Sequence, residues 1–319
     1  MPRFLIRRVS FGALVMLIVS LVVFILFFVA NKDVAASFCG KTCTPAREAV
    51  VERRLGLDRS YLAQYLSFLW DVVRLNFGQS FIDQREVTDK LKEGLPATAS
   101  LAGGAAVLWL LMGIPIGITA ATKPRSIRDR LSTIFALTGL SLPSFVVGLV
   151  LLNLLYFQLT TRGYPWFPPS GYIPLTEDPF EWARHLVLPW FTLAFITAAS
   201  YARLTRGSML EVLGEDYIRT ARAKGLSERK VVYKHGLRSA LTPIVTLLGI
   251  DVGVLLGGTV VTEKLVGLQG IGQRALSAVL TSDLPVVLGT VLVAAFFIVI
   301  ANIVVDIAYA LLDSRVRLS

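Results

Sequence analysis

The chain has 319 residues, of which 54% are hydrophobic and only 17% are charged. A soluble domain carries about 25% charged residues, so the composition excludes an ordinary water-soluble globule, and its hydrophobicity excludes an intrinsically disordered chain. The mean hydropathy of +0.65 agrees with an integral membrane protein. The formal net charge is +10, and the positions of the cations along the chain are more informative than their sum.

Six apolar runs are long enough for membrane-spanning helices, which need about 20 mostly apolar residues. They are Val9–Ala30, Ala97–Ala121, Leu131–Phe157, Leu186–Ala202, Leu241–Thr262 and Leu284–Leu312. The first run follows Arg3, Arg7 and Arg8 and could be taken for a secretory signal. Its apolar stretch is longer than that of a signal peptide, which favours a retained anchor. The prediction is therefore an all-α integral membrane protein with six transmembrane helices.

The cations of the short loops predict the orientation of the chain, because short loops rich in Lys and Arg stay in the cytoplasm. The segment Arg203–Arg238 alone holds nine Lys and Arg residues. The short loops on the other side, between the third and fourth runs and between the fifth and sixth, hold two each. Both termini are thus predicted to be cytoplasmic. This topology accounts for the positive charge without a nucleic-acid partner.

The predicted spans divide the chain into four parts. These are a cytoplasmic tail with the first span (1–30), an extracytoplasmic segment (31–96), a transmembrane core with a cytoplasmic loop at 203–240 (97–312), and a cytoplasmic tail (313–319).

The extracytoplasmic segment contains one apolar stripe at helical spacing. Asp58 is placed to cap a helix on which four apolar residues recur, namely Leu62, Leu66, Leu69 and Val73, and Tyr65, Phe68 and Trp70 broaden this stripe. We expect this stripe to pack on the outer face of the protein rather than to bind the membrane surface.

Cys39 and Cys43 are the two cysteines of the chain, and both lie in the extracytoplasmic segment. Thiols outside the cytoplasm tend to be oxidised, which favours a disulfide between them. The two histidines, His185 and His235, lie on opposite sides of the predicted bilayer and cannot share a metal. We therefore predict no metal site.

A nucleotide-binding phosphate loop is missing from the sequence. The nearest match to its pattern is Gly267–Gln273, which lacks the lysine that would reach the phosphates. The chain is not expected to hydrolyse a nucleotide by that route.

Asp251 lies near the middle of the fifth predicted span, where a charge is costly and marks a functional site by default. Gly249, Gly253 and Gly257 form a packing ladder on the same helix. Asp251 is two residues from the nearest glycines, about 200° around the helix, so it points away from the ladder. Two interpretations are equally supported: Asp251 lines a water-filled path, or it pairs with a polar group of a neighbouring helix.

Asp306 lies close to the cytoplasmic end of the last span, a few residues from Arg315 and Arg317, which favours a structural ion pair. Two intramembrane aspartates also suggest an aspartyl protease. That chemistry needs two carboxylates that face each other at similar depth, and Asp251 and Asp306 differ in depth. An intramembrane protease is a remote alternative.

The stretch Glu215–Ser227 in the long cytoplasmic loop is basic, favours a helix and ends at Gly225, a residue that suits a helix C-cap. It resembles the coupling-helix loop of ABC importer permeases in the form used by the dipeptide/oligopeptide/nickel class. The general motif reads Glu-Ala-Ala-x3-Gly, and here Arg219-Thr220-Ala221 and Gly225 stand at its positions, without the glutamate. The resemblance assigns ATPase coupling to Tyr217, Arg219, Thr220, Ala221, Ala223, Lys224, Gly225 and Leu226.

The resemblance extends over most of the chain, which is similar to the first permease subunit of that class. It is carried by Leu55–Arg59, Gln64-Tyr65, Asn76–Ser80, Leu95–Thr98, Gly113–Gly117, Pro285–Val287 and the tail Asp306…Arg315. Other positions also depart from the class: Gln269 and Ser314 replace prolines, Asp251 replaces an uncharged polar residue, and the Cys39/Cys43 pair is not a general feature.

The resemblance implies a type I ABC importer permease in a bacterial-type cytoplasmic membrane. Its partners would be a second homologous permease, two ABC ATPase subunits or a fused pair, an extracytoplasmic solute-binding protein and membrane lipid. ATP and Mg²⁺ would bind the ATPase subunits, so this chain would hold no cofactor and would not be an enzyme. Short peptides are the expected cargo, because few Met, Cys and His residues are present; nickel and glutathione are the alternatives.

Overall fold

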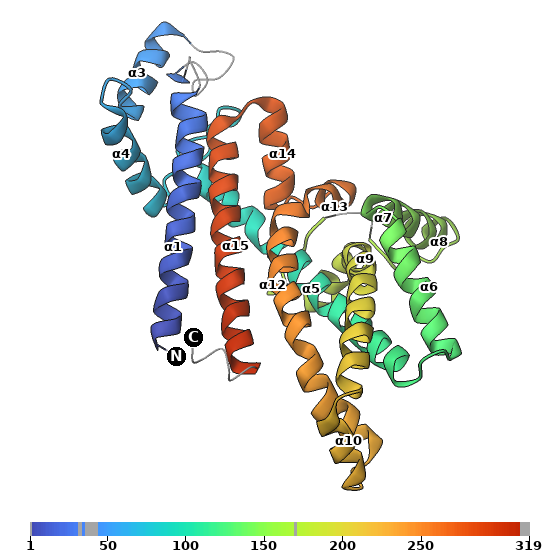
Figure 1. Ribbon diagram of the computed structural model, residues 1–319. Coiled ribbons are helices and arrows are strands. Elements are labelled where there is room, and N and C mark those ends of the chain that lie inside the picture. The colour runs from blue at the N-terminus through green and yellow to red at the C-terminus, as the bar shows by residue number, and fades with distance from the viewer. Residues whose placement is uncertain (1, 31–33, 36–43, 169–170, 313–319) are drawn as a thin grey trace.

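A computed structural model describes residues 2–30, 34–35, 44–168 and 171–312 (Figure 1). These residues are almost entirely helical, with one isolated antiparallel bridge between Gln79 and Glu86. The α-helices are α1 (Pro2–Phe24), α3 (Pro45–Leu55), α4 (Tyr61–Val73), α5 (Val87–Thr122), α6 (Ile127–Ser141), α7 (Ser144–Leu151), α8 (Gln158–Thr161), α9 (Pro179–Leu213), α10 (Asp216–Ala223), α11 (Glu228–Lys230), α12 (Leu237–Gly258), α13 (Val260–Leu265), α14 (Ile271–Thr281) and α15 (Leu284–Leu312). Short π-helical segments extend α1 and α7 and precede α12, at Ile25–Val29, Leu152–Phe157 and Val231–Gly236.

Five described helical stretches are long and apolar enough to cross a membrane. They are Phe4–Val29, Val87–Thr122, Ser144–Thr161, Pro179–Leu213 and Leu284–Ile307. Four of these stretches overlap the first, second, fourth and sixth predicted spans. The fifth predicted run, 241–262, is divided between α12, of 22 residues, and the short α13.

The predicted span Leu131–Phe157 is wrong, because the helix breaks near its middle. Pro143 has no N–H and its ring excludes the preceding residue from the helical region. Leu142 accordingly has extended backbone angles (φ −98°, ψ 130°), and α6 ends at Ser141. The candidate span begins after this break, at Ser144.

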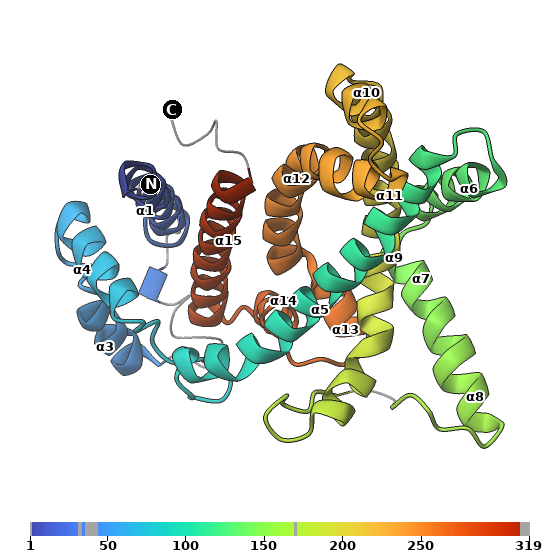
Figure 2. The same ribbon diagram turned by 90° about the horizontal axis from the view of Figure 1, so that it is seen from below.

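The centre of the molecule is the contact between α5 and α9, which cross at close range (Figure 2). Two glycines of α5 make the approach possible: a Cβ on Gly113 would lie 2.7 Å from the Tyr201 Cβ, and one on Gly117 would lie 2.5 Å from the Thr205 Cβ. Small residues at this spacing let helix backbones approach in a membrane. Trp109 and Tyr201 are fully buried beside them, with ring centroids 5.8 Å apart.

The first helix packs on the last, α1 against α15. A Cβ on Gly12 would come within 2.8 Å of Val299, so this contact is also close. Asp306 forms its ion pair here, with Arg8 at 3.0 Å. The structural role predicted for Asp306 therefore holds, but the partner comes from α1; the predicted partners Arg315 and Arg317 lie outside the described residues.

The amphipathic helix of the extracytoplasmic segment forms as α4, with two differences from its prediction. Its N-cap is Ser60, whose hydroxyl accepts from the Ala63 N–H, and not Asp58. Its buried face carries Phe68, which packs against Phe24 and Phe28 of α1 and its π-helical extension at 5.8 and 5.6 Å. The predicted stripe thus packs on the protein through Phe68 and Tyr65. The rest of it points largely outward: Leu62, Leu66 and Val73 are 69%, 57% and 69% exposed.

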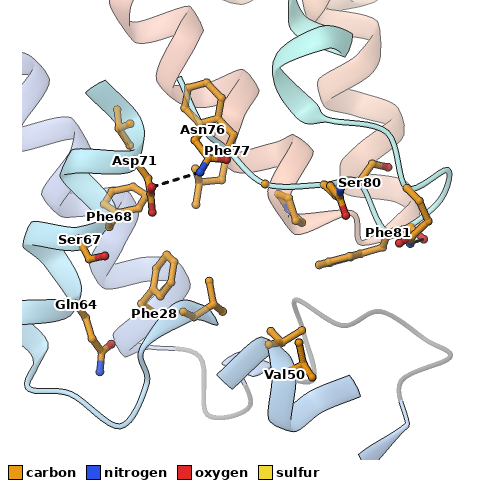
Figure 3. A pocket seen from close by; sticks show the side chains of 18 residues that line it. Phe28, Val50, Gln64, Ser67, Phe68, Asp71, Asn76, Phe77, Ser80 and Phe81 are labelled. Atoms are coloured by element: carbon orange, nitrogen blue, oxygen red, sulfur yellow. Dashed lines mark hydrogen bonds between the residues drawn. The ribbon is translucent and has the colours of Figure 1, made fainter. Parts of the chain in front are cut away.

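The inner side of α4 closes a cavity of about 310 Å³ between α3, α4 and the 74–84 segment. Figure 3 shows Gln64, Phe68 and Asp71 of α4 on one wall of this cavity, with Asn76 beside Asp71 and Ser80 farther away, across the cavity from α4. Asp71 accepts a hydrogen bond from Asn76 at 3.4 Å, which ties the end of α4 to the following segment.

The glycine-rich stretch Gly267–Gln273 packs against a buried carboxyl group of its own chain, that of Glu263. Glu263 is completely buried and accepts hydrogen bonds from the hydroxyls of Thr98 (2.7 Å) and Thr259 (2.9 Å) and from the Gln273 N–H (2.8 Å). A Cβ on Gly270 would lie 2.4 Å from this carboxylate, so the turn needs glycine there. Glu263 thus joins α5, α13 and the start of α14.

Removing this carboxylate should destabilise the protein measurably. We expect Glu263→Ala to lower the free energy of unfolding by about 2–4 kcal/mol, because it leaves two buried hydroxyls and an N–H without their acceptor. Denaturant unfolding of the purified transporter in detergent measures the change. Glu177→Ala, at an exposed glutamate on the same side of the membrane, is the matched control and should stay within about 0.5 kcal/mol of wild type. Equal stability of the two variants would contradict this assignment.

Candidate functional site

Helix α10 projects beyond the ends of α5, α9 and α12 (Figure 1). The start of α1 and the last described turns of α15 lie toward the same end of the molecule, whereas α3, α4 and α14 lie toward the other. This arrangement places the basic loop on the side where the sequence predicts the cytoplasm.

Three apolar residues hold α10 against its own chain. Ile218 and Ala221, on one face of the helix, form a small buried cluster with Val231. Ala221 is 8% exposed. It was predicted as a coupling residue together with its neighbours, but its side chain faces inward and is part of the anchor of α10.

The other predicted coupling residues are exposed and form one continuous outward surface, which we call the α10 surface. It consists of Tyr217, Arg219, Thr220, Ala223, Lys224, Gly225 and Leu226. Ala223 is the small side chain on the face opposite Ile218, and it leaves room for close contact with another protein.

Gly225 ends α10 for a reason of backbone geometry. Its φ of +76° lies in the left-handed region, which glycine enters without steric cost. The Gly225 N–H donates to the Arg222 carbonyl at 2.9 Å, and the Leu226 N–H donates to the Ala221 carbonyl at 3.3 Å. The helix thus ends where it is predicted to end, with Lys224 as the C-cap and Gly225 directly after it. Open space surrounds Gly225, since no atom lies within 4 Å of the position that a Cβ would take there.

Polar contacts fix the loop to the membrane helices. The Tyr217 hydroxyl donates to Ser239 of α12 at 3.0 Å. At the same end of the molecule Arg206 of α9 donates to both carboxylate oxygens of Asp129, at 2.6 and 3.1 Å. These charged hydrogen bonds hold the pKa of Asp129 below its usual value. The pair clamps the start of α6 to α9, near the end of the molecule from which α10 projects.

The geometry around Asp251 agrees with the predicted two-faced helix. A Cβ on Gly249 would lie 2.8 Å from Val305, and one on Gly253 would lie 3.4 Å from Ile298, so the ladder packs on α15. Asp251 is half-buried on the other face, toward α9, where it interacts electrostatically with the Tyr201 hydroxyl.

Buried polar groups of α5 and α9 adjoin this carboxylate. The Tyr201 hydroxyl interacts with both Asp251 and Trp109. Neither Trp109 Nε1 nor the Tyr201 hydroxyl has a partner among the described residues at the distance and angle of an ordinary hydrogen bond. No cation forms an ion pair with Asp251 in the described part of the chain. Three helices, α5, α9 and α12, thus converge on a polar cluster inside an apolar bundle.

The arrangement does not suit the enzymatic alternatives. Asp306 is paired with Arg8, while Asp251 faces α9, so the two carboxylates do not meet. Within the described ranges no three His, Cys, Asp or Glu side chains come together as a metal site would need. Cys39 and Cys43 lie outside the described residues, so their disulfide stays a prediction.

Long apolar helices, a projecting basic helix on one side and a polar cluster within the bundle define a membrane transport subunit. Comparison with known proteins agrees with this class. Residues 113–318 match the family described as binding-protein-dependent transport system inner membrane component, and residues 1–102 match the N-terminal region of such components. The chain belongs to this family: it is the permease component of an ABC importer in the inner membrane and not a catalytic chain.

Relatives align over nearly their whole length. A putative peptide transport system permease protein of Brucella abortus is 38% identical over 317 residues, which cover 99% of each chain. An oligopeptide transport system permease protein of Bacillus subtilis is 34% identical over 99% of this chain and all of its own. A glutathione transport system permease protein of Salmonella typhimurium is 35% identical over 95% of this chain and 94% of its own.

A solved structure shows the same fold at lower identity. The MetNI methionine ABC transporter in an inward-facing conformation contains a chain that matches with a TM-score of 0.52 and 21% identity, over 70% of this chain and 96% of that one. The fold is therefore that of an ABC importer permease.

Several structural residues were missed by sequence reasoning. Ile218 and Val231 anchor α10, and Trp109 and Tyr201 border Asp251. A signal existed for Ile218, since it is the one large aliphatic side chain in a polar helix. No sequence pattern distinguished Trp109 or Tyr201 from other aromatic residues in apolar spans.

Proposed function

We propose that this chain is the permease through which an ABC importer moves short peptides across the cytoplasmic membrane. The observation that carries the proposal is full-length similarity to permeases named for peptide and oligopeptide transport. Glutathione, itself a short peptide, is the second candidate cargo, because a glutathione permease is similar at nearly the same identity. Nickel is disfavoured by the lack of a ligand cluster among the described residues.

In this proposal six helices span the membrane, with α12 as the one beyond the five identified by length and composition. Both termini and α10 face the cytoplasm. A second homologous permease completes the pathway, and a solute-binding protein delivers cargo on the side of α3, α4 and α14. Two ABC ATPase subunits, or a fused pair, bind ATP and Mg²⁺ beneath.

The α10 surface is the proposed contact with one ATPase subunit. Exposed side chains on a helix that is itself held by Ile218, Ala221 and Val231 can transmit a displacement without unfolding. ATP binding closes the two ATPase subunits on each other. The free energy of ATP binding switches the permease between its two states only if the ATPases bind these states with different affinity.

The cargo can be tested with the whole transporter in vesicles. The permease pair, ATPases and binding protein are reconstituted, and ATP-dependent uptake of a labelled dipeptide, a labelled pentapeptide, glutathione and Ni²⁺ is compared. Saturable uptake of the peptides is expected. Uptake of Ni²⁺ or of glutathione alone would overturn the proposed cargo while leaving the transport class intact.

The coupling role of the α10 surface predicts a specific effect of charge at Ala223. Ala223→Asp should reduce uptake by more than about tenfold, because an uncompensated carboxylate buried in a protein interface costs about 3 kcal/mol. Assembly with the second permease should be retained, and ATPase activity should no longer respond to the binding protein. Ala46→Asp, at an exposed alanine of α3, is the matched control and should transport normally.

The same substitution at Ala221 separates anchoring from coupling. Ala221→Asp buries the charge within this chain, so we expect the loop to become sensitive to protease at 214–236.

Normal uptake and normal ATPase stimulation in the Ala223→Asp variant would contradict the coupling role of the α10 surface.

The proposed role of Asp251 is to attract the ammonium end of a peptide as it passes. An opposite charge in a wet pore is worth a few tenths to about 1 kcal/mol. Asp251→Asn should therefore slow uptake of free-amino peptides by about two- to fivefold more than uptake of their N-acetylated forms. Asp306→Asn removes a carboxylate that is already paired with Arg8, and it should affect both peptide types alike. An equal effect of Asp251→Asn on both types would exclude the ammonium contact.

The disulfide between Cys39 and Cys43 remains part of the proposal. Alkylation of the unreduced protein followed by mass spectrometry should find neither cysteine modified, and both should react after reduction. Two alkylated thiols before reduction would contradict it.

A further inference from the structure

Helix α4 is apolar on its outward side and on the side that packs against α1, while Gln64 and Asp71 face the cavity. Its inner face contacts α1 and the cavity through Tyr65 and Phe68. Asp71 is its one charged side chain, and it lies on the cavity side, bonded to Asn76 (Figure 3). A helix with little polar surface is stable only when both faces leave water.

The outward face of α4, which we call the α4 outer face, consists of Leu62, Leu66, Trp70 and Val73. These residues recur at helical spacing along one side, and Trp70 is 56% exposed. In Figures 1 and 2, α4 lies at the periphery beside α1, and no described element covers its outer side. The α4 outer face is therefore a continuous apolar surface without a protein neighbour among the described residues.

The depth of α4 follows from its contact with the first span. The Tyr65 hydroxyl lies 3.0 Å from the Ser20 hydroxyl and donates to the Leu17 carbonyl at 3.3 Å. Both partners lie inside the apolar stretch Phe4–Val29. Ser20 is nine residues before its outer end, about 14 Å at 1.5 Å per residue. The tip of Tyr65 thus reaches well below the outer end of an apolar helix.

The first span also exposes apolar side chains along the length that contacts α4. On α1 and its π-helical extension, Ile18, Val22 and Ile25 are 50%, 49% and 45% exposed. Near the end of α4 the Arg74 guanidinium stacks over the Trp70 ring, 4.3 Å from its centroid. An exposed tryptophan with a stacked arginine is typical of the membrane interface, where the ring meets lipid and the charge meets headgroups.

We propose that the α4 outer face binds the acyl chains and headgroup region of the outer leaflet, so that α4 is an interfacial helix that extends the lipid-facing surface of α1. The extracytoplasmic segment is then anchored to the bilayer as well as to the permease. The sequence favours packing on the protein over membrane contact for this stripe. The outward direction of its exposed side chains supports membrane contact instead.

Tryptophan emission tests the proposal in the assembled transporter. The complex is reconstituted in phosphatidylcholine vesicles and in vesicles of the same lipid brominated on its acyl chains. Subtraction of the Trp70→Phe variant isolates the emission of Trp70. We expect brominated lipid to remove most of this emission and aqueous iodide to leave it largely unchanged. Trp109 is fully buried and provides the control. Its emission, isolated by subtraction of the Trp109→Phe variant, should be quenched by neither brominated lipid nor iodide.

A second variant tests the same face if the Trp70→Phe variant does not assemble into the transporter. Leu62→Trp adds a tryptophan at the 69% exposed end of the same face, and its additional emission should be quenched by brominated lipid. Quenching by iodide alone would show that the face meets water and would overturn the proposal. Resistance to both quenchers would show that a partner protein covers it, with the same consequence.

Discussion

The close contact between α5 and α9 is the constraint on which the rest of the structure depends. Helices in lipid gain little from excluding apolar surface, so their association relies on packing at short range. Gly113 and Gly117 supply that range, because a side chain at either position would overlap α9. The contact brings Trp109 and Tyr201 together and fixes α9, which carries part of the polar cluster and leads directly into the cytoplasmic loop.

Helix α9 connects the two candidate sites. Its 35 residues extend about 52 Å, from the extracytoplasmic cap at Asp178 to Leu213, just before α10. It carries Tyr201 beside Asp251 and Arg206 in the clamp with Asp129. Because α5 packs along it and α10 follows its end, a force applied to α10 would move α9 as a body. Motion at the cytoplasmic surface would then change the surroundings of Asp251 without any rearrangement between them.

Sequence reasoning identified the spans and the projecting helix, but it did not identify which way apolar residues point. Apolar runs suffice for spans, because the bilayer demands them wherever they lie. The break at Pro143 shows that the length of an apolar run is not sufficient evidence for a span. An apolar run can be continuous in sequence although a proline interrupts its helix. The predicted direction of the side chain was wrong for Leu62 and Leu66, which point outward, and for Ala221, which points inward. In a membrane protein, lipid and protein are both apolar environments, so hydrophobic spacing does not distinguish the face that meets lipid from the face that meets another helix.

Carboxylates in and near the bundle show how context decides their role. Glu263 is held by two hydroxyls and an N–H, Asp129 by Arg206, and Asp306 by Arg8. Each of these partners compensates the cost of removing a charge from water, so each carboxylate serves the fold. Asp251 has no such cation among the described residues, and its side-chain partner among them is the Tyr201 hydroxyl. A charge at membrane depth is costly and marks a functional site by default. The feature that sets Asp251 apart from the other three carboxylates is thus a neutral partner in place of a cation or several donors, which is the basis for the role proposed for it above.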